Sequence, residues 1–466
     1  MNYIIAILVI GLSIFLFKKA SGTLKINLIN VSSYVFYILM AFEFVGLTLI
    51  YLGFRDHYII GKLNNNNVIN IAYWSMSYVM IILPITMILA NRYIFKIKNM
   101  KTTYIDNINK EIVLEDNKVQ QRIFIFITIA LVICFLAMIY VFYCIGYIPF
   151  FKYFDNNFDY ATERININRE FDGNVYVKNI IMVFLTPLLS YIAYIYMRTT
   201  KQKKWLVLFI ISFVLSIVVK TYDFSKAPII YYICFFFIIE VMLGKTKKLK
   251  KIIPYLVITI ILVLVLYYVI MGYNGNILSL TGGPMSRVIM SQAGALLLHF
   301  EAFPEKIDYL GGHSFPPFTK IIFGGGEYDV RSGRSVMALY FPENIENGTA
   351  GVMSTVFLGE AYANFGFVGV AISPIVVGLI FSAILCIYLK SKKTPLNIIL
   401  YLECFIIFTN VLNAGFIDFF YNINFILTLM LIFGLKILSS ENLKEKTKKL
   451  VNECKNKFIK RNGKER

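Results

Sequence analysis

Long apolar runs separated by short polar segments dominate this chain. Runs such as 123–145 and 252–271 hold about twenty residues each with almost no charged side chain, and a helix of that length crosses a hydrocarbon core about 30 Å thick. The pattern predicts an all-α polytopic membrane protein with about 11 transmembrane helices. The predicted spans are 2–17, 31–53, 67–90, 123–145, 176–197, 205–220, 227–243, 252–271, 366–389, 396–413 and 421–438.

Two of the polar segments are much longer than a simple connection needs. The first runs over 146–176 and the second over 272–350. Connections of that length usually carry function, and the many aromatic residues of the second favour a packed segment over a disordered one. Within it, 287–303 is a candidate for a further short or re-entrant helix. We therefore expect a membrane helical domain (1–271), a large extracytoplasmic loop region (272–350), a second membrane helical domain (351–438) and a basic cytoplasmic tail (439–466).

Composition and charge narrow the class of protein. Of the 466 residues, 58% are hydrophobic and only 16% are charged, which excludes a soluble enzyme, a disordered chain and a secreted disulfide scaffold. The formal net charge is +19, but 33 of the 46 basic residues lie in alternate short connections and in the tail. This positive-inside pattern indicates that the partner of the chain is a lipid bilayer and not nucleic acid. It places the N-terminus outside and the C-terminus in the cytoplasm.

The outer segments also carry isolated cations among mixed neighbours. An arginine fork matches phosphate and carboxylate groups, so several such residues from separate segments are suited to hold a diphosphate. The alternative interpretation is that each arginine pairs locally with a nearby acid. For Lys226, which lies between two spans, the alternative is that its side chain extends along the helix end to the membrane surface. The candidate cations are Arg164, Arg169, Lys226, Arg287, Arg331 and Arg334.

Carboxylates and histidines supply candidates for acid–base chemistry. Glu360 and Asn364 lie four residues apart where the chain re-enters the membrane, so they share one helix face. Glu360 is our first candidate for a general base and His299 the second; the alternatives are a hydrogen-bond anchor for the loop and an interfacial histidine. Asp418, in the last outer turn, is suited to either purpose.

Other features limit the chemistry. Three carboxylates lie within spans, and we expect them to find buried partners: Glu43, Glu240 and Glu403. The six cysteines show no metal-ligand spacing, so we expect no metal site and no cofactor. No P-loop or dinucleotide motif is present. The energy for any reaction must therefore come from an activated, lipid-linked substrate or from a gradient.

Four short motifs carry a resemblance to a known family. The first long segment opens with GYIPFF and then presents Arg164, and the turn after the sixth span contains SKAPII. The second long segment begins with SRVIMSQAG, and the chain returns to the membrane through FLGEAYANFGFVGV. In these features the chain resembles the Wzy-type O-antigen polymerases, also called oligosaccharide repeat unit polymerases.

The resemblance implies a membrane glycosyltransferase, similar to the C-type fold, in the bacterial inner membrane. Such an enzyme transfers a growing glycan from undecaprenyl diphosphate to a lipid-linked oligosaccharide repeat unit on the extracytoplasmic face, in O-antigen, capsule or exopolysaccharide synthesis. The cations named above would hold the diphosphate without a metal ion, and Glu360 or His299 would take the proton of the acceptor hydroxyl. A chain-length regulator protein is an implied partner.

Two other functions stay open. A flippase or transporter for lipid-linked oligosaccharide also needs a cationic cavity, although it does not need an outer segment as long as 272–350. An O-antigen ligase performs the same chemistry on a different acceptor. The ligases carry a His followed by a Gly after seven intervening residues, and neither His299 nor His313 is followed by this glycine.

Overall fold

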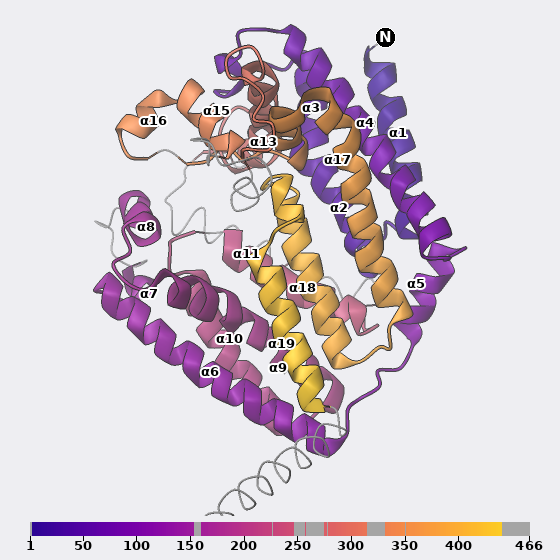
Figure 1. Ribbon diagram of the computed structural model, residues 1–466, viewed down its shortest axis with the longest axis vertical. Coiled ribbons are helices and arrows are strands. Elements are labelled where there is room, and N and C mark those ends of the chain that lie inside the picture. Colours follow the sequence, from indigo (N-terminus) through magenta and orange to yellow (C-terminus); the bar gives the residue numbers. More distant parts are fainter. Residues whose placement is uncertain are drawn as a thin grey trace, which may run out of the picture.

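The structure is a computed structural model that describes residues 2–152, 160–225, 227–246, 257, 275–276, 278–314, 331–349 and 351–439. Within these ranges the chain forms helices and turns and contains no strand (Figure 1). The predicted all-α membrane fold is confirmed at this level. The predicted span 252–271, apart from residue 257, lies outside the described residues, as does Lys226.

Helices occupy all ten of the other predicted spans. Among the described residues, seven stretches are long and apolar enough to cross a membrane, and α11 and α18 are shorter apolar helices. The count of eleven crossings stays a prediction. The helices at these spans are α1 (Asn2–Ser21), α2 (Val31–Leu39) continued by η2 (Met40–Phe44) and α3 (Val45–Tyr51), α4 (Asn67–Leu89), α6 (Asn117–Ile145), η5 (Val177–Leu185) continued by α9 (Thr186–Thr200), α10 (Lys203–Lys220), α11 (Ala227–Met242), α17 (Phe357–Lys390), α18 (Pro395–Val411) and α19 (Ile423–Ser439).

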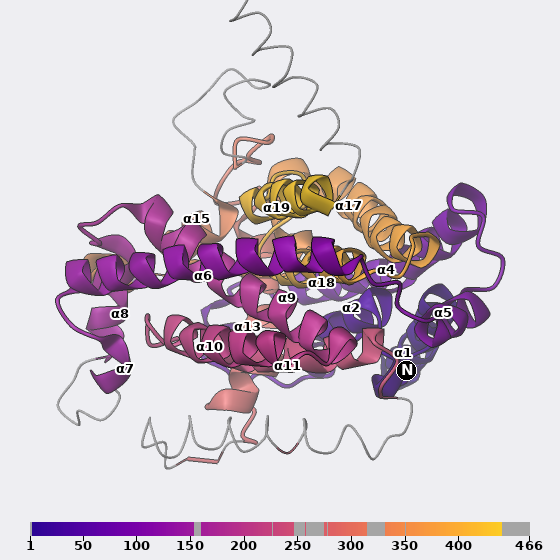
Figure 2. The ribbon, with the colours of Figure 1, turned by 90° about the horizontal axis from the view of Figure 1, so that it is seen from below.

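The helices are arranged in layers. Seen from below, α9 and α18 lie in the middle, with α10 and α11 on one side and α17 and α19 on the other (Figure 2). The last turns of α1, α9 and α17 carry lysine or arginine. The ends of these three helices mark what we call the basic end of the molecule. The opposite, loop end holds α15 (Ser332–Tyr340) and α16 (Pro342–Glu346), at the upper left of Figure 1.

A buried lysine fastens the basic end. The short helix α5 (Met100–Asn109) lies beside the turn that joins α17 to α18. The Lys393 ammonium group, only 4% exposed, donates to the carbonyls of Asn107, Ile108 and Lys110 at 3.1, 2.9 and 3.2 Å. The final carbonyls of a helix have no partner within the helix and carry partial negative charge. One cation therefore satisfies the end of α5 and ties it to the α17–α18 turn.

The helix expected near 287–303 is present and deeply packed. It is α13 (Pro284–Ala302), and every residue from Ala293 to Ala302 is buried. It contacts η2, α3, α4 and α17. Small residues allow this approach, because a Cβ on Gly46 would lie 1.9 Å from the Ile289 carbonyl oxygen and a Cβ on Gly294 would lie 2.8 Å from Ile59. The second long segment is therefore partly built into the helical core, as its aromatic content predicted.

A kink in α17 marks the start of the ninth predicted span. The helix begins at Phe357, but Gly366 breaks it with φ 57° and ψ −141°, a conformation that side chains with a Cβ rarely adopt. The Tyr309 ring packs against this glycine and leaves no room for a Cβ. The turn before the kink, which carries Glu360 and Asn364, is thus held at the loop end while the rest of α17 runs toward the basic end.

Candidate functional site

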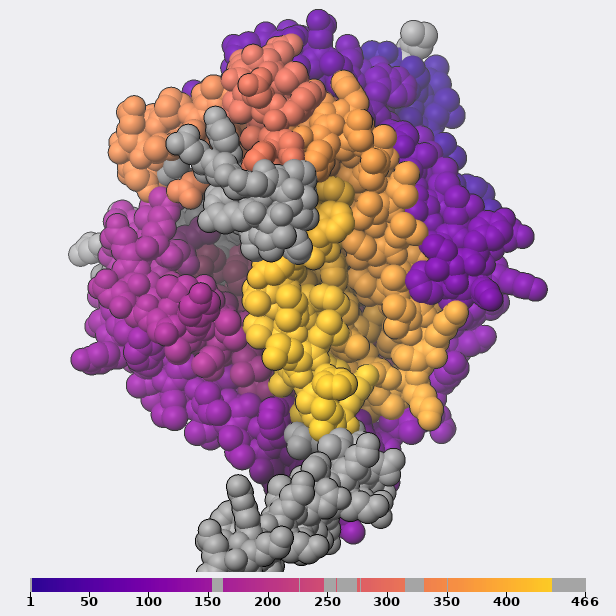
Figure 3. Space-filling model, in the orientation of Figure 1, coloured from indigo at the N-terminus to yellow at the C-terminus, as the bar shows by residue number. Residues whose placement is uncertain are grey.

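The part of the chain that the structure describes encloses a cavity of about 760 Å³. It opens between α19 and the helices of residues 160–200, where Figure 3 shows the surface hollowed. We call it the membrane cavity. Its wall mixes apolar side chains with amides, phenols and three charged groups. It is lined by Asn179, Val183, Phe184, Pro187, Leu188, Tyr191, Lys220, Ala227, Pro228, Tyr231, Tyr232, Phe235, Glu403, Ile406, Ile407, Asn410, Val411, Ala414, Asp418, Asn422, Ile423 and Asn424.

Two opposite charges face this cavity without forming an ion pair. Lys220 is the last residue of α10, and its ammonium group donates to the Val183 carbonyl at 3.3 Å. Glu403 lies in the middle of α18 and is 4% exposed. Among the described residues, its carboxylate accepts no hydrogen bond and has no cation within 4 Å. Within the described ranges the expectation of a buried partner is therefore not met for Glu403, nor for Glu43, whose two carboxylate oxygens accept no hydrogen bond. Glu240 does pair with Arg198, at 2.6 Å.

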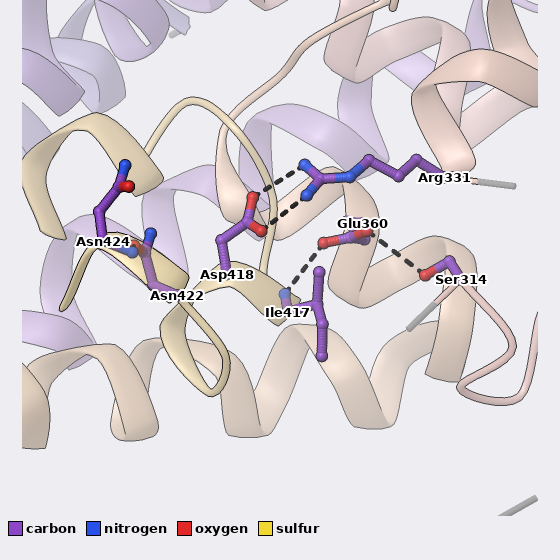
Figure 4. Close-up of polar contacts among 7 residues, drawn as sticks. All are labelled: Ser314, Arg331, Glu360, Ile417, Asp418, Asn422 and Asn424. Carbon is purple, nitrogen blue, oxygen red and sulfur yellow. Dashed lines mark hydrogen bonds and ion pairs between the residues drawn. The ribbon is translucent and has the colours of Figure 1, made fainter. Parts of the chain in front are cut away.

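An arginine–aspartate pair lies at the rim of the membrane cavity. Arg331, just before α15, donates from its two terminal nitrogens to the two carboxylate oxygens of Asp418 at 2.8 and 2.7 Å (Figure 4). Asp418 belongs to the turn between α18 and α19 and lines the membrane cavity. This two-pronged geometry is the strong form of an ion pair. It joins the second long segment to the last loop-end turn, and it occupies both Arg331 and Asp418.

Glu360 lies behind this pair in a tightly packed place. Its carboxylate accepts from the Ile417 amide at 3.0 Å and from the Ser314 hydroxyl at 3.3 Å (Figure 4). A Cβ on Gly415 would lie 2.4 Å from it. The adjacent cavity, which Arg331 also lines, measures only about 10 Å³, room for about one water molecule. The described residues around Glu360 thus leave no space for a sugar beside its carboxylate.

Asn364 acts as an anchor for the segment before residue 315. Its amide nitrogen donates to the Ser314 hydroxyl and to the Glu360 carbonyl, both at 2.8 Å, and its amide oxygen accepts from the Gly312 amide at 3.1 Å. The side chain is 1% exposed. The predicted shared face of Glu360 and Asn364 is present, and both members contact Ser314. This geometry matches the alternative interpretation, a hydrogen-bond anchor for the loop.

His299 is buried at the end of α13 beside the same small cavity. Its Nδ1–H donates a hydrogen bond to the Ala295 carbonyl oxygen at 2.8 Å, so Nε2 is the acceptor nitrogen and faces the Ser332 hydroxyl at 3.4 Å. Burial lowers the pKa of His299 from 6.5 to about 4 because the low-dielectric interior disfavours the imidazolium. The ring is neutral at pH 7, and its free lone pair is enclosed by protein.

The remaining predicted cations do not gather into one site. Arg164 and Arg169 are exposed on α8 (Tyr160–Arg169), and Arg169 donates to the Gly348 carbonyl at 2.8 Å, which links the two long segments. Arg287 is exposed on the first turn of α13 and Arg334 on α15. Of the six candidates, only Arg331 meets another predicted site residue within the described ranges.

Sequence reasoning missed the two charged groups inside the membrane cavity. Lys220 is the last residue of the predicted span 205–220 and is not among the predicted site residues, and Glu403 is expected only to have a buried partner. One signal was available, because Glu403 and Asn410 are seven residues apart and so lie on the same face of α18. A polar stripe on an otherwise apolar helix points to a cavity or a partner helix.

No metal site accompanies these groups in the described ranges, which contain no group of three histidine, cysteine or carboxylate side chains that could hold an ion. The chain as a whole was compared with protein-family models, with curated proteins and with solved structures, and none of the three comparisons finds a match.

Proposed function

We propose that this chain is a polysaccharide polymerase that transfers a growing glycan from undecaprenyl diphosphate to a lipid-linked oligosaccharide repeat unit. The proposal combines the family resemblance of the four sequence motifs with the membrane cavity. The cavity is the observation that carries it. Its volume, about 760 Å³, lies within the usual range for sites that hold a small-molecule ligand.

The lining of the cavity suits an amphipathic substrate. Leu188, Phe235 and Ile407 offer apolar surface to a polyprenyl tail, while Asn410 and Asn424 offer amides to sugar hydroxyls. Lys220 supplies a positive charge where a diphosphate leaving group gains negative charge, which is the largest electrostatic demand of this reaction. Arg331, at the rim, is a second cation that an incoming diphosphate can draw away from Asp418.

Charge also supports the orientation. Because lysine and arginine gather at the basic end, the positive-inside rule makes that end cytoplasmic and the loop end extracytoplasmic. The membrane cavity is lined by the halves of α9 and α18 nearer the loop end. It would therefore receive substrates from the outer leaflet, in a bacterial inner membrane, where a chain-length regulator would find α15 and α16 accessible.

The test is reconstitution. Purified protein in liposomes, given its repeat unit linked to undecaprenyl diphosphate, should produce a ladder of longer glycans. Lys220→Met should reduce ladder formation at least about 100-fold, the cost expected for removing one group that stabilises developing charge. Lys203→Met, at the other end of the same helix and exposed, is the matched control and should leave the ladder intact.

The same experiment separates the other functions. A flippase would scramble the labelled lipid between leaflets without extending the glycan, and this result with the cognate repeat unit would refute the polymerase. A ligase would move the glycan to a lipid acceptor of another kind and would leave repeat units unjoined.

A further inference from the structure

Asp418 is held by Arg331, and the two glutamates of the candidate site, Glu360 and Glu403, lie in opposite environments. Glu360 has both oxygens engaged, one by the Ile417 amide and one by the Ser314 hydroxyl, beside a space of about 10 Å³. Glu403 faces about 760 Å³. A glycosyl acceptor needs its hydroxyl within about 3 Å of the base in a reactive pose. Space alone therefore favours Glu403, even though Glu360 stands in the more conspicuous sequence motif.

The surroundings of Glu403 strengthen this assignment. A buried carboxylate normally accepts several hydrogen bonds, yet the Glu403 side chain has none from the part of the chain that the structure describes, although it is 96% buried. Tyr191 lines the same cavity, but its hydroxyl donates to the Tyr232 carbonyl at 3.0 Å. Lys220 and Glu403 interact electrostatically across the cavity but do not form an ion pair. The carboxylate is thus left open toward the space where a ligand fits.

We propose that Glu403 is a catalytic residue, the general base that accepts the proton of the acceptor hydroxyl, and that Glu360 is a positioning residue. This inference rests on the proposed function. Glu360 holds the turn between α18 and α19 through the Ile417 amide, and the same turn carries Asp418 to the cavity rim. Its effect on the reaction is therefore indirect.

The step balances with groups already in the cavity. The acceptor hydroxyl gives its proton to the Glu403 carboxylate while its oxygen forms a bond to the anomeric carbon of the donor sugar. The bond between that carbon and the diphosphate oxygen breaks, and its electron pair stays on the diphosphate. Lys220 offsets the negative charge that develops there. The proton then passes from Glu403 to the diphosphate or to water, and the carboxylate is ready for another cycle.

The experiment compares single-turnover rates of glycan extension in liposomes that contain full-length protein. Glu403→Gln should lower the rate about 100-fold or more, the usual contribution of a general base. Its affinity for a fluorescent undecaprenyl diphosphate should stay within about twofold of wild type, and its thermal midpoint within a few degrees. Glu403→Asp should recover part of the rate. Glu305→Gln, exposed at the loop end, is the matched control and should behave as wild type.

A pH profile distinguishes the catalytic from the positioning role. The wild-type rate should fall toward acid as the base becomes protonated, and the residual rate of Glu403→Gln should lose this acid limb. Glu360→Gln should keep the acid limb and lower donor binding or the thermal midpoint instead. Full activity in Glu403→Gln, or loss of the acid limb in Glu360→Gln, would overturn the assignment. Absence of any ladder in wild type would count against the proposed function, a separate outcome.

Discussion

The buried histidine at the end of α13 makes stability depend on pH in a calculable way. His299 is 1% exposed, and burial lowers its pKa from 6.5 to about 4. Between pH 6.5 and pH 4, His299 is therefore protonated in the unfolded chain and neutral in the folded chain. By linkage, this group leaves stability unchanged near pH 7 and destabilises the fold as the pH falls. The loss is about 2 kcal/mol by pH 5 and approaches about 3 kcal/mol near pH 4.

The assay is the difference in free energy of unfolding between wild type and His299→Asn in detergent micelles, followed by chemical denaturation. Asparagine can keep the donor to the Ala295 carbonyl but does not titrate. Taking the difference removes the contribution of every other group, because both proteins share them. The wild type should lose about 2 kcal/mol relative to the variant between pH 7 and pH 5. A flat difference would refute the reasoning and would mean that Glu360, beside the same small cavity, stabilises the imidazolium enough to offset burial.

Three further substitutions test the fold. Lys393→Met should lower the free energy of unfolding by about 2 kcal/mol, because three backbone carbonyls lose their donor. Lys392 is exposed, so Lys392→Met is the control and should leave the thermal midpoint unchanged. Asp418→Asn should lower the free energy of unfolding by about 1–2 kcal/mol. This value lies between those for exposed and buried ion pairs because the Arg331 side chain is 41% exposed. An unchanged thermal midpoint would show that the pair adds no stability. Gly366→Ala should cost about 1–3 kcal/mol because its backbone conformation excludes a Cβ, and a wild-type unfolding curve would contradict the kink.

The helical fold could be read from the sequence because bilayer spans depend on local composition. A run such as 123–145 must satisfy its backbone internally in lipid, so a helix is the only solution open to it. The helix α6 accordingly covers this run. The burial of α13 among α3, α4 and α17 could not be predicted in the same way. Its small residues allow close packing, but the sequence does not show which helices pack against them.

The candidate site could be predicted only in part. The shared face of Glu360 and Asn364 follows from helix geometry and is present, but their partner Ser314 comes from a distant turn that no spacing rule identifies. The membrane cavity arises where several helices fail to close around Lys220 and Glu403. Such a space is a property of tertiary packing, so sequence reasoning that searched the outer segments for charge passed over both residues.

The position of α13 has a consequence for how the protein is made. Its seat is formed by α3 and α4, which leave the ribosome early, and by α17, which emerges only after α13 itself. The seat of α13 is therefore complete only after α17 has been made. A nascent chain that stops before residue 390 lacks part of α17, one wall of the seat of α13, and should be a substrate for membrane quality control.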